Sequence, residues 1–391
     1  MKILICSVSS VLGGMERRME AETRLLGKMG HEVVVATAPF RGLKQWKTEI
    51  DKAGGKYISW RPYKFIERQH WPAVFRWLAM TTLPMLRKEK FDLAHIAMPW
   101  NYAGLSIAHV LRQANVPFVI SIHCKFDTQI LPEHGRTLVK QALTGMVGGY
   151  AVSEPVKESF MRMYAGLLPP TTLLKTILNG IDTERFKPDA VMRRSVRQRL
   201  GLDAQKFIVM FCGRIDPMKR PLLAARVFSE LSKKNSEARL LVLGEGAELP
   251  ALKAEIQSLG LSDRVVIVGQ VSDTAPYYAA SDIYLSTSRN QEGCPLAAAE
   301  ALACGLPAVV PDDDVFRSIY GSSEAVRRCD PTGQSGWDSA LIGLATLNEN
   351  ERRDLSQQAQ SFTKTHLSQN LMEKNLALFY QNLFDREQND S

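Results

Sequence analysis

Short apolar runs alternate with amphipathic segments along most of the chain, and this alternation restricts the possible folds more than any other feature. The apolar runs have the length of β-strands, whereas the segments between them repeat their apolar residues at helical spacing. Strands that are joined through helices pair in parallel, because a parallel connection requires a long crossover. A parallel sheet is covered by helices on both faces, so we expect an α/β fold.

The first stretch of alternation extends from the N-terminus to about residue 177. Its expected strands are residues 2–8, 31–37, 57–60, 92–97, 118–122, 149–152 and 173–177. Its expected helices are residues 16–30, 71–88, 103–115, 133–146 and 154–164. The first residues are as apolar as a signal peptide, but no small-x-small cleavage site follows them, so we expect a buried strand there.

A second stretch of alternation begins after a turn-like tetrapeptide, Asn179-Gly180-Ile181-Asp182, and a polar segment, residues 183–205. That segment is basic and contains Arg193, Arg194, Arg197 and Arg199. The expected strands are then 207–212, 239–243, 264–268, 282–286 and 308–310, and the expected helices are 221–234, 247–259, 274–280 and 295–304.

We therefore expect two Rossmann-like parallel-sheet domains, residues 1–183 and residues 184–370. Two such domains that face each other place a ligand cleft at the carboxyl ends of their strands. The segment that remains, residues 371–384, is amphipathic and is expected to form a final helix.

Composition excludes several classes of protein. The chain of 391 residues is 45% hydrophobic and 23% charged, as in a globular protein. Its six scattered cysteines contain no C-x-x-C, which argues against a disulfide framework or a zinc site and suits a reducing cytosol. No apolar run approaches the ~18–20 residues of a membrane span. The net charge of +8 suits anionic lipid or a phosphorylated acceptor, and nucleic acid ranks last because no nucleic-acid-binding motif is present.

Residues 291–310 predict a loop, a short alanine-rich helix, a tight turn and a buried strand. Pro295 suits the first helical position, where its missing N–H group costs nothing. Gly305 suits a left-handed C-cap, and Pro307 prevents the helix from continuing. The free N–H groups at residues 293–297 and the positive end of the helix dipole favour a bound anion.

Two carboxylates flank this anion site, Glu292 before the helix and Glu300 two turns inside it. Carboxylates accept hydrogen bonds from vicinal hydroxyl groups, such as those of a ribose or a pyranose. The arrangement therefore fits a nucleotide-sugar, with its diphosphate at the helix end. The alternative interpretation is a surface helix that carries two solvated glutamates.

The stretch E-G-C-P-L-A-A-A-E-A-L-A-C-G-L-P, with Glu292 and Glu300 eight positions apart, resembles the signature of glycosyltransferase family four. The resemblance implies the GT-B fold, a retaining reaction and a final helix that crosses back onto the first domain. It also implies that Glu292 contacts the donor sugar and Glu300 the nucleotide ribose. The helix start, Gly293, Cys294, Pro295 and Leu296, would then bind the donor.

The second domain opens with a buried strand that is followed by Gly213, Arg214 and, five residues further on, Lys219. Arg214 has the forked geometry that binds phosphate oxygens, and Lys219 supplies a point charge. This segment resembles the G-R-x4-K motif with which the family binds the donor diphosphate. Solvated charges on a loop are the alternative.

Glycines at other strand ends add to the expected donor site. Residues 241–249 contain Gly-x-Gly but lack the third glycine of a dinucleotide fingerprint, and they match the family's second nucleotide strand. The segment from Val268 to Val271, with Gly269, lies where the family's backbone meets the base. Gly13 and Gly14 lie in G-G-x-E-R, which resembles the loop that faces the diphosphate from the first domain, with a plain tight turn as the alternative.

His123 follows the strand at residues 118–122, and a histidine in this position is usually structural. The family carries a histidine near the donor sugar at the corresponding place, so the resemblance implies a catalytic role for His123. Its neighbours, Cys124 and Lys125, replace the small residue that often follows in the family.

Aromatic and basic residues interleave in residues 57–77, as they do at a membrane interface or at the lip of a glycan-binding site. The alternative is that the aromatic residues belong to the core and the charges are solvated. We therefore expect either an anionic membrane surface as a partner or an ordinary surface here.

The chain departs from the family after the strand at 308–310, where Pro311-Asp312-Asp313-Asp314 replaces the usual glycine pair. We find no D-x-D sequence at a strand end near the expected cleft, so we expect no metal. We also find no carboxylate that matches a family nucleophile, and attack on the face from which the leaving group departs is the retaining route that the resemblance implies.

These features together predict a retaining glycosyltransferase that moves a hexose-type sugar to a glycan or lipid-linked acceptor, in the synthesis of cell-surface polysaccharide or glycoconjugates. The donor would be a nucleoside diphosphate sugar, with UDP or GDP the favoured nucleotide, and no cofactor is expected. The catalytic candidates are His123, Arg214, Lys219 and Glu292. The expected location is the cytoplasm, including the inner face of the membrane. The alternatives are an epimerase or phosphorylase on the same fold and a non-catalytic sugar-nucleotide or glycan-binding protein.

Overall fold

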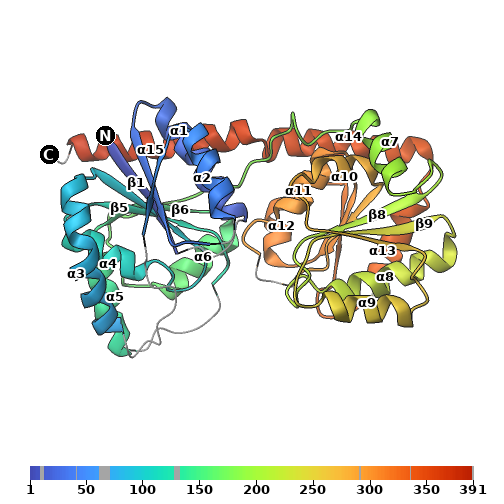
Figure 1. The fold of residues 1–391 in the computed structure, drawn as a ribbon, viewed down its shortest axis with the longest axis horizontal. Coiled ribbons are helices and arrows are strands. Elements are labelled where there is room, and N and C mark those ends of the chain that lie inside the picture. Colours follow the sequence, from blue (N-terminus) through green and yellow to red (C-terminus); the bar gives the residue numbers. More distant parts are fainter. Residues whose placement is uncertain are drawn as a thin grey trace. The chain divides into compact units, whose positions relative to one another are not determined.

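The computed structural model describes residues 1–8, 13–40, 42–60, 71–126, 133–289, 292–334 and 336–389. They form two compact α/β units, one comprising Met1–Asn179 with Met372–Ser391 and the other Gly180–Leu371. The first unit therefore ends four residues before the expected boundary at 183, and the second extends one residue beyond 370. In each unit a sheet lies between layers of helices (Figure 1).

The first unit contains a sheet of seven parallel strands in the order β3-β2-β1-β4-β5-β6-β7. The strands are β1 (Lys2–Ser7), β2 (Glu32–Thr37), β3 (Lys56–Ser59), β4 (Leu93–Met98), β5 (Phe118–Ile122), β6 (Met146–Ala151) and β7 (Leu173–Thr176). The strand order reverses between β1 and β4, and open α/β sheets bind ligands at the carboxyl ends of strands at such a switch point.

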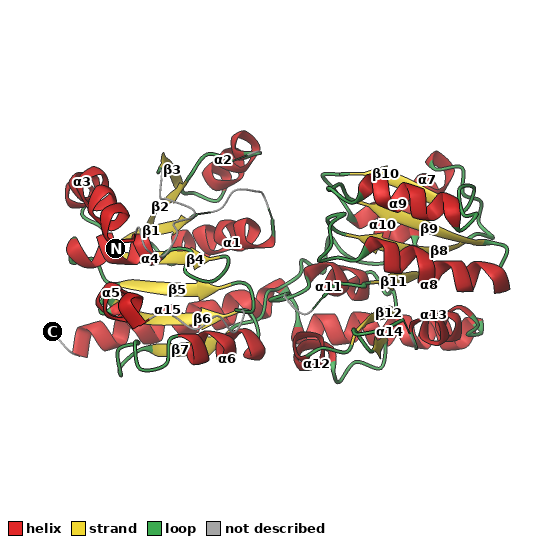
Figure 2. Cartoon of the chain, turned by 90° about the horizontal axis from the view of Figure 1, so that it is seen from below, coloured by secondary structure: helices red, strands yellow, loops and turns green. Residues whose placement is uncertain are grey.

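The helices of the first unit cover both faces of this sheet (Figure 2). They are α1 (Gly14–Lys28), α2 (Leu43–Lys52), α3 (Trp71–Glu89), α4 (Leu105–Gln113), α5 (Glu133–Leu143), α6 (Glu154–Met163) and α15 (Gln369–Asn389). All six residues of β4 and all five of β5 are buried, as expected for strands covered on both sides.

The second unit contains six parallel strands in the order β10-β9-β8-β11-β12-β13, with a switch point between β8 and β11. The strands are β8 (Phe207–Cys212), β9 (Ala238–Leu243), β10 (Val265–Gly269), β11 (Ile283–Leu285), β12 (Ala308–Pro311) and β13 (Val326–Cys329). The helices are α7 (Ala190–Arg199), α8 (Pro221–Lys234), α9 (Leu249–Ser258), α10 (Ala275–Ala280), α11 (Leu296–Ala303), α12 (Asp314–Tyr320), α13 (Trp337–Ala345) and α14 (Glu349–His366).

Helix α15 returns the chain to the first unit and completes its core. One face of the helix contributes five buried side chains, Met372, Leu376, Phe379, Tyr380 and Leu383, to the cluster that contains residues of α1, β1 and β2. The helix is longer than the expected 371–384, because it begins two residues earlier and continues to Asn389.

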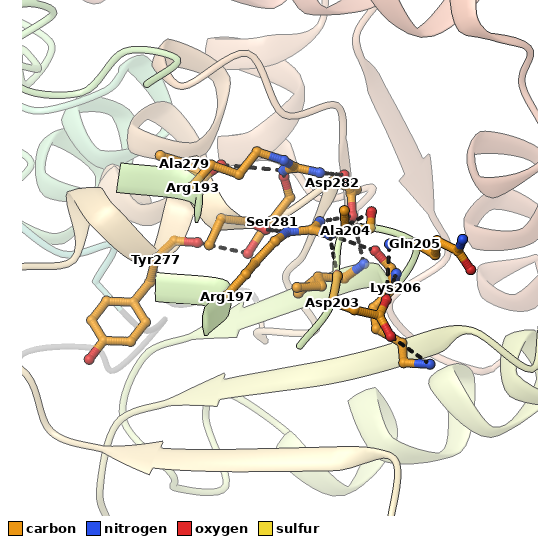
Figure 3. Close-up of polar contacts among 12 residues, drawn as sticks. Arg193, Arg197, Asp203, Ala204, Gln205, Lys206, Tyr277, Ala279, Ser281 and Asp282 are labelled. Atoms are coloured by element: carbon orange, nitrogen blue, oxygen red, sulfur yellow. Dashed lines mark hydrogen bonds and ion pairs between the residues drawn. The ribbon is translucent and has the colours of Figure 1, made fainter. Parts of the chain in front are cut away.

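The basic segment between the units is not a simple linker, because residues 190–199 form α7. The guanidinium groups of Arg193 and Arg197 bind the two oxygens of Asp282 at 2.6 and 2.9 Å. Asp282 Oδ2 also accepts a hydrogen bond from the backbone N–H group of Ile208, so this carboxylate joins α7 to the start of β8 (Figure 3). Both arginines therefore form ion pairs within the second unit and stabilise it.

Candidate active site

The loop that follows β8 carries the expected phosphate-binding residues. Asp216 orders this loop, because its Oδ1 accepts hydrogen bonds from the N–H groups of Met218 and Lys219, both at 3.1 Å. Arg214 is 63% exposed and pairs with Asp216 Oδ2 at 3.0 Å. The side chain of Lys219 passes beside Gly213, where an added Cβ atom would lie 3.4 Å from Lys219 Cε.

Lys219 and Glu292 form an ion pair in the second unit, with side-chain exposures of 20% and 15%. The pair joins the β8 loop to the loop that precedes α11. The side chain of Thr287 supports the same junction, since its hydroxyl oxygen lies 2.9 Å from the carbonyl oxygens of both Lys219 and Arg220, which share its single hydrogen. Two residues that the sequence analysis assigned to the active site are thus in contact.

Arg220 anchors this loop, a role that the sequence analysis missed. It adopts a positive φ of 49° at the N-cap of α8, and its guanidinium group donates to the carbonyl oxygens of Thr287 and Pro331. A basic residue before Pro221 carries no sequence signal for this role, because its partners come from distant loops.

Helix α11 begins at Leu296, one residue later than expected, and Pro295 is its N-cap. Proline has no side-chain group that could cap the first turn, and the N–H group of Ala298 donates to its carbonyl oxygen at 3.2 Å. The hydroxyl group of Tyr320 donates to the carbonyl oxygen of Pro295 at 2.9 Å and so fixes the entrance to the helix. Gly305 follows the helix with a φ of +77°, which confirms the expected left-handed turn.

Glu300 lies in α11 and is partly exposed. Burial raises the pKa of the Cys212 thiol at the end of β8 to about 12, and the charge of Glu300 adds to this shift. Burial likewise raises the pKa of the Tyr284 hydroxyl group, with further contributions from Cys212, Glu292 and Glu300. Both glutamates therefore raise the pKa of the buried Tyr284 hydroxyl group in β11.

Three loops of the second unit meet at glycines. An added Cβ atom at Gly244 would lie 1.8 Å from the carbonyl oxygen of Gly213, and one at Gly246 would lie 2.3 Å from that of Ile215. Gly269 has a φ of +85°, and its carbonyl oxygen accepts a hydrogen bond from the N–H group of Gly244 at 2.8 Å. Val271 follows in a partly exposed segment. The Gly-x-Gly sequence thus permits close backbone packing beside the Arg214 loop.

In the first unit, Gly13 is the N-cap of α1, and Gly14 is the first helical residue. The N–H group of Gly13 donates to Glu16 Oε2 at 2.7 Å. Glu16, the acidic residue of G-G-x-E-R, therefore accepts a hydrogen bond from a backbone N–H group in the loop that we expected to face a phosphate group.

His123 lies directly after β5 and is 9% exposed. Its Nε2 atom is 2.9 Å from the hydroxyl oxygen of Ser121. Burial lowers the pKa of His123 to about 3, and the positive charge of Arg18 adds to this shift, so the ring is neutral near pH 7. A neutral imidazole can form hydrogen bonds but carries no positive charge.

The described residues of the stretch 57–77 differ in their exposure to solvent. Trp60 is buried, as the alternative of a core position for the aromatic residues would have it, and Tyr57 donates a hydrogen bond to the carbonyl oxygen of Thr37 at 3.0 Å. Residues 61–70 lie outside the described residues. In α3, Trp77 is 42% exposed and Met80 is 70% exposed.

The acidic run at residues 312–314 has structural partners. Asp312 lies 3.1 Å from Arg317 Nε and 3.2 Å from Arg328 Nε, and Asp313 caps α12 by accepting from the N–H group of Phe316 at 2.9 Å. Helix α12 thus begins where the family has its glycine pair. Within the described ranges, no group of three or more histidine, cysteine or acidic residues is arranged to hold a metal ion.

None of the helices in the described part of the chain combines the length and apolar character that crossing a membrane requires. The six cysteines, all within the described residues, form no disulfide bond with one another.

Known proteins resemble this chain over most of its length. A family model described as "Glycosyltransferase Family 4" matches residues 12–185, and one described as "Glycosyl transferases group 1" matches residues 192–362. A D-inositol 3-phosphate glycosyltransferase of Frankia alni is 29% identical over 326 residues, which is 76% of this chain and 77% of the relative.

Two further relatives align with different shares of this chain. A phosphatidylinositol N-acetylglucosaminyltransferase subunit of Arabidopsis thaliana is 25% identical over 352 residues, 87% of this chain and 73% of its own. A D-inositol 3-phosphate glycosyltransferase of Xylanimonas cellulosilytica is 33% identical, but over 41% of this chain and only 40% of its own length.

Solved structures share the fold at low sequence identity. A glycosyltransferase from Rickettsia africae aligns over 98% of both chains with a TM-score of 0.82 and 18% identity. Anabaena HepE in complex with UDP aligns over 98% of this chain and 100% of its own with a TM-score of 0.76 and 19% identity. Two parallel-sheet α/β units of this topology define the GT-B fold of glycosyltransferases. Together with the two family models, this shows that the chain belongs to glycosyltransferase family four.

Proposed function

We propose that the protein transfers a hexose-type sugar, with retention of configuration, from a nucleoside diphosphate sugar to a glycan or lipid-linked acceptor. The observation that carries the proposal is the ion pair of Lys219 and Glu292 at the carboxyl end of the second sheet. It holds a cation suited to a diphosphate beside a carboxylate suited to sugar hydroxyl groups.

The leaving nucleoside diphosphate gains negative charge as the bond to the anomeric carbon breaks. In the proposed mechanism, Arg214, Lys219 and the N-terminus of α11 stabilise this charge without a metal ion, since preorganised positive groups lower the energy of a charged transition state. The leaving phosphate then assists attack by the acceptor hydroxyl on the same face. Glu292 and Glu300 bind hydroxyl groups of the sugar and the ribose.

The donor nucleotide in the proposal is UDP or GDP. Anabaena HepE, which shares the fold, has been solved with UDP and with UDP-glucose, which supports UDP. Some relatives are named for lipid substrates, such as the alpha-monoglucosyldiacylglycerol synthase of Streptococcus pneumoniae, and this supports a lipid-linked acceptor. Both proposals suit an enzyme that acts at the inner face of the membrane, in the synthesis of cell-surface glycoconjugates.

The test is a screen of UDP-, GDP-, ADP- and TDP-sugars for slow hydrolysis by the purified protein. We expect one donor to release its nucleoside diphosphate, and Glu292→Gln and Lys219→Ala to slow this release strongly. Lys233→Ala, which breaks an exposed ion pair with Glu230 in α8, is the matched control and should act like the wild type. Binding without turnover would instead favour a binding protein, phosphate-dependent release a phosphorylase, and an altered sugar on an intact nucleotide an epimerase.

A further inference from the structure

A line of buried polar groups ends at His123 in the first unit. Glu22 Oε2 lies 2.7 Å from His95 Nδ1, and His95 Nε2 lies 2.7 Å from the hydroxyl oxygen of Ser121. That oxygen lies 2.9 Å from His123 Nε2. Glu22, His95 and Ser121 have no exposed surface, so water does not satisfy their polar atoms, and contacts within the protein must offset the cost of desolvating them.

The strand register explains why these residues meet. In the parallel pair β4–β5, Ser121 lies opposite Ala97, two residues beyond His95. Because side chains alternate across a strand, His95, Ser121 and His123 lie on one face of the sheet. Helix α1 brings Glu22 to this face, and Tyr380 of α15 places its hydroxyl oxygen 3.5 Å from His95 Nδ1.

The negative charge of Glu22 determines which atom carries the hydrogen between Glu22 Oε2 and His95 Nδ1. Burial raises the pKa of this carboxyl group, but contacts with His95, Arg18 and Tyr150 outweigh burial and lower it, so Glu22 is ionised near pH 7. Arg18 Nε donates to Glu22 Oε1 at 3.2 Å, and the hydroxyl group of Tyr150 donates to the same oxygen. An ionised carboxylate only accepts, and a nitrogen 2.7 Å from it must carry a hydrogen atom, so His95 Nδ1 is protonated.

The directions of the remaining hydrogen bonds, at His95 Nε2, Ser121 and His123, follow from the balance of charge. Arg18 already offsets the charge of Glu22, so a neutral His95 leaves no unbalanced charge in the core. With its hydrogen on Nδ1, His95 accepts at Nε2 from the hydroxyl group of Ser121. A hydroxyl group has a single hydrogen, so the Ser121 oxygen is an acceptor towards His123, whose Nε2 atom must donate.

We propose that Glu22, His95 and Ser121 are positioning residues that fix His123 in the tautomer with its hydrogen on Nε2. His123 Nδ1 is then an obligatory hydrogen-bond acceptor. If the protein transfers sugar as proposed and His123 contacts the donor sugar, as the resemblance to the family implies, Nδ1 selects a hydroxyl group and rejects a carboxylate at that contact, which favours a neutral sugar over a uronic acid.

The test uses the full chain labelled with 15N-histidine, and long-range 1H–15N spectra distinguish protonated from unprotonated ring nitrogens. The signals of His123 are assigned by their loss in His123→Gln. We expect an unprotonated Nδ1 and a protonated Nε2 in the wild type near pH 7.5. Ser121→Ala removes the acceptor for Nε2, so both ring signals of His123 should move towards the averages of a mixed tautomer population. Should Ser121→Ala fail to fold, Ser121→Cys preserves most of the volume and tests the same step.

Ser159→Ala is the matched control, because Ser159 is a buried serine of the same unit whose hydroxyl group bonds Val156 and the backbone of Phe126. It should leave the His123 signals unchanged. A protonated Nδ1 in the wild type, or His123 signals that Ser121→Ala does not alter, would overturn the tautomer assignment whether or not the protein transfers sugar. If the tautomer is as proposed and a screened donor is used, a uronic acid donor that reacts as fast as the neutral hexose donor would refute the selection by Nδ1.

Discussion

Lys219 and Glu292 stand 73 residues apart in the sequence, and their side chains form an ion pair between the loops that follow β8 and precede α11. A diphosphate that approaches Lys219 must share its ammonium group with Glu292. Donor binding would thereby free the carboxylate of Glu292 to accept hydrogen bonds from the sugar.

The first prediction concerns the cations of this site. Lys219→Ala and Arg214→Ala should each lower kcat by ~10²–10³, because each removes preorganised charge that stabilises the leaving group. Affinity for the acceptor should change much less. Steady-state kinetics with the donor found by the screen provides the measurement, with Lys233→Ala as control; a uniform loss of acceptor binding would point to misfolding.

The second prediction concerns metal ions. We expect full activity in excess EDTA, since the proposed charge stabilisation uses only protein groups. The assay compares initial rates with and without chelator, before and after addition of Mn²⁺ or Mg²⁺. Activity that disappears in EDTA and returns with a metal would contradict the proposed mechanism and would shift attention to Asp312–Asp314.

The third prediction concerns Glu300. Glu300→Gln retains the shape of the side chain but weakens its hydrogen bonds to hydroxyl groups, so the donor Kd should rise. Hydrogen bonds to charged groups are worth roughly 1.5–3 kcal/mol. Titration calorimetry gives the Kd, and Glu230→Gln on the exposed face of α8 serves as control. Equal donor affinity of the Glu300 variant and the wild type would remove Glu300 from the site.

The fourth prediction concerns acid stability. Because the pKa of His123 is about 3 in the folded protein, against an ordinary value of 6.5, the unfolded state binds a proton first as the pH falls. The stabilisation from this group is complete above pH 6.5 and is lost progressively towards pH 3. Glu22 adds a similar loss, but only below pH 4.5.

Hydrogen exchange of the β5 amides at about pH 7.5 and pH 5 isolates the contribution of His123, because Glu22 remains ionised in both states at these values. With about 1.4 kcal/mol per pKa unit, the wild type should lose about 2 kcal/mol more than His123→Gln over this interval. Equal losses in the two proteins would contradict the depressed pKa.

The fifth prediction concerns the membrane. If α3 contacts lipid, the protein should sediment with anionic vesicles and dissociate at high salt. Replacing the exposed Trp77 and Met80 by serine should reduce sedimentation, whereas Leu378→Ser, at an exposed apolar residue of α15, should not. Equal sedimentation of both variants and the wild type would identify α3 as ordinary surface.

The sequence predicts the strands of both sheets except β13, because runs such as Phe118–Ile122 and Phe207–Cys212 are apolar throughout and bounded by polar or turn residues, whereas Arg327 and Arg328 interrupt β13. It also predicts which loops carry Lys219 and Glu292. It does not indicate α2, α7 or α14, whose residues are mostly polar. A helix such as α7 is stabilised by Arg193 and Arg197 binding Asp282, and a sequence pattern does not reveal contacts over such separations.

The same limit explains why the sequence does not connect Glu22, His95 and Ser121 with His123. A glutamate in a helix, a histidine in a strand and a serine in the next strand are unremarkable when read singly. They become a connected group only when the parallel register of β4 and β5 and the packing of α1 bring them to one face.

The division of the first unit between the two ends of the chain has a consequence for synthesis. The second unit is a continuous segment, Gly180–Leu371, so it can fold as soon as the ribosome has released it. The first unit must wait, because the buried side chains of α15, from Met372 to Leu383, are made only after the second unit. Until then, the apolar surface around β1 and β2 that α15 covers stays exposed. A nascent chain that stalls before residue 372 is therefore a natural target for chaperones and proteases, even though half of it is already folded.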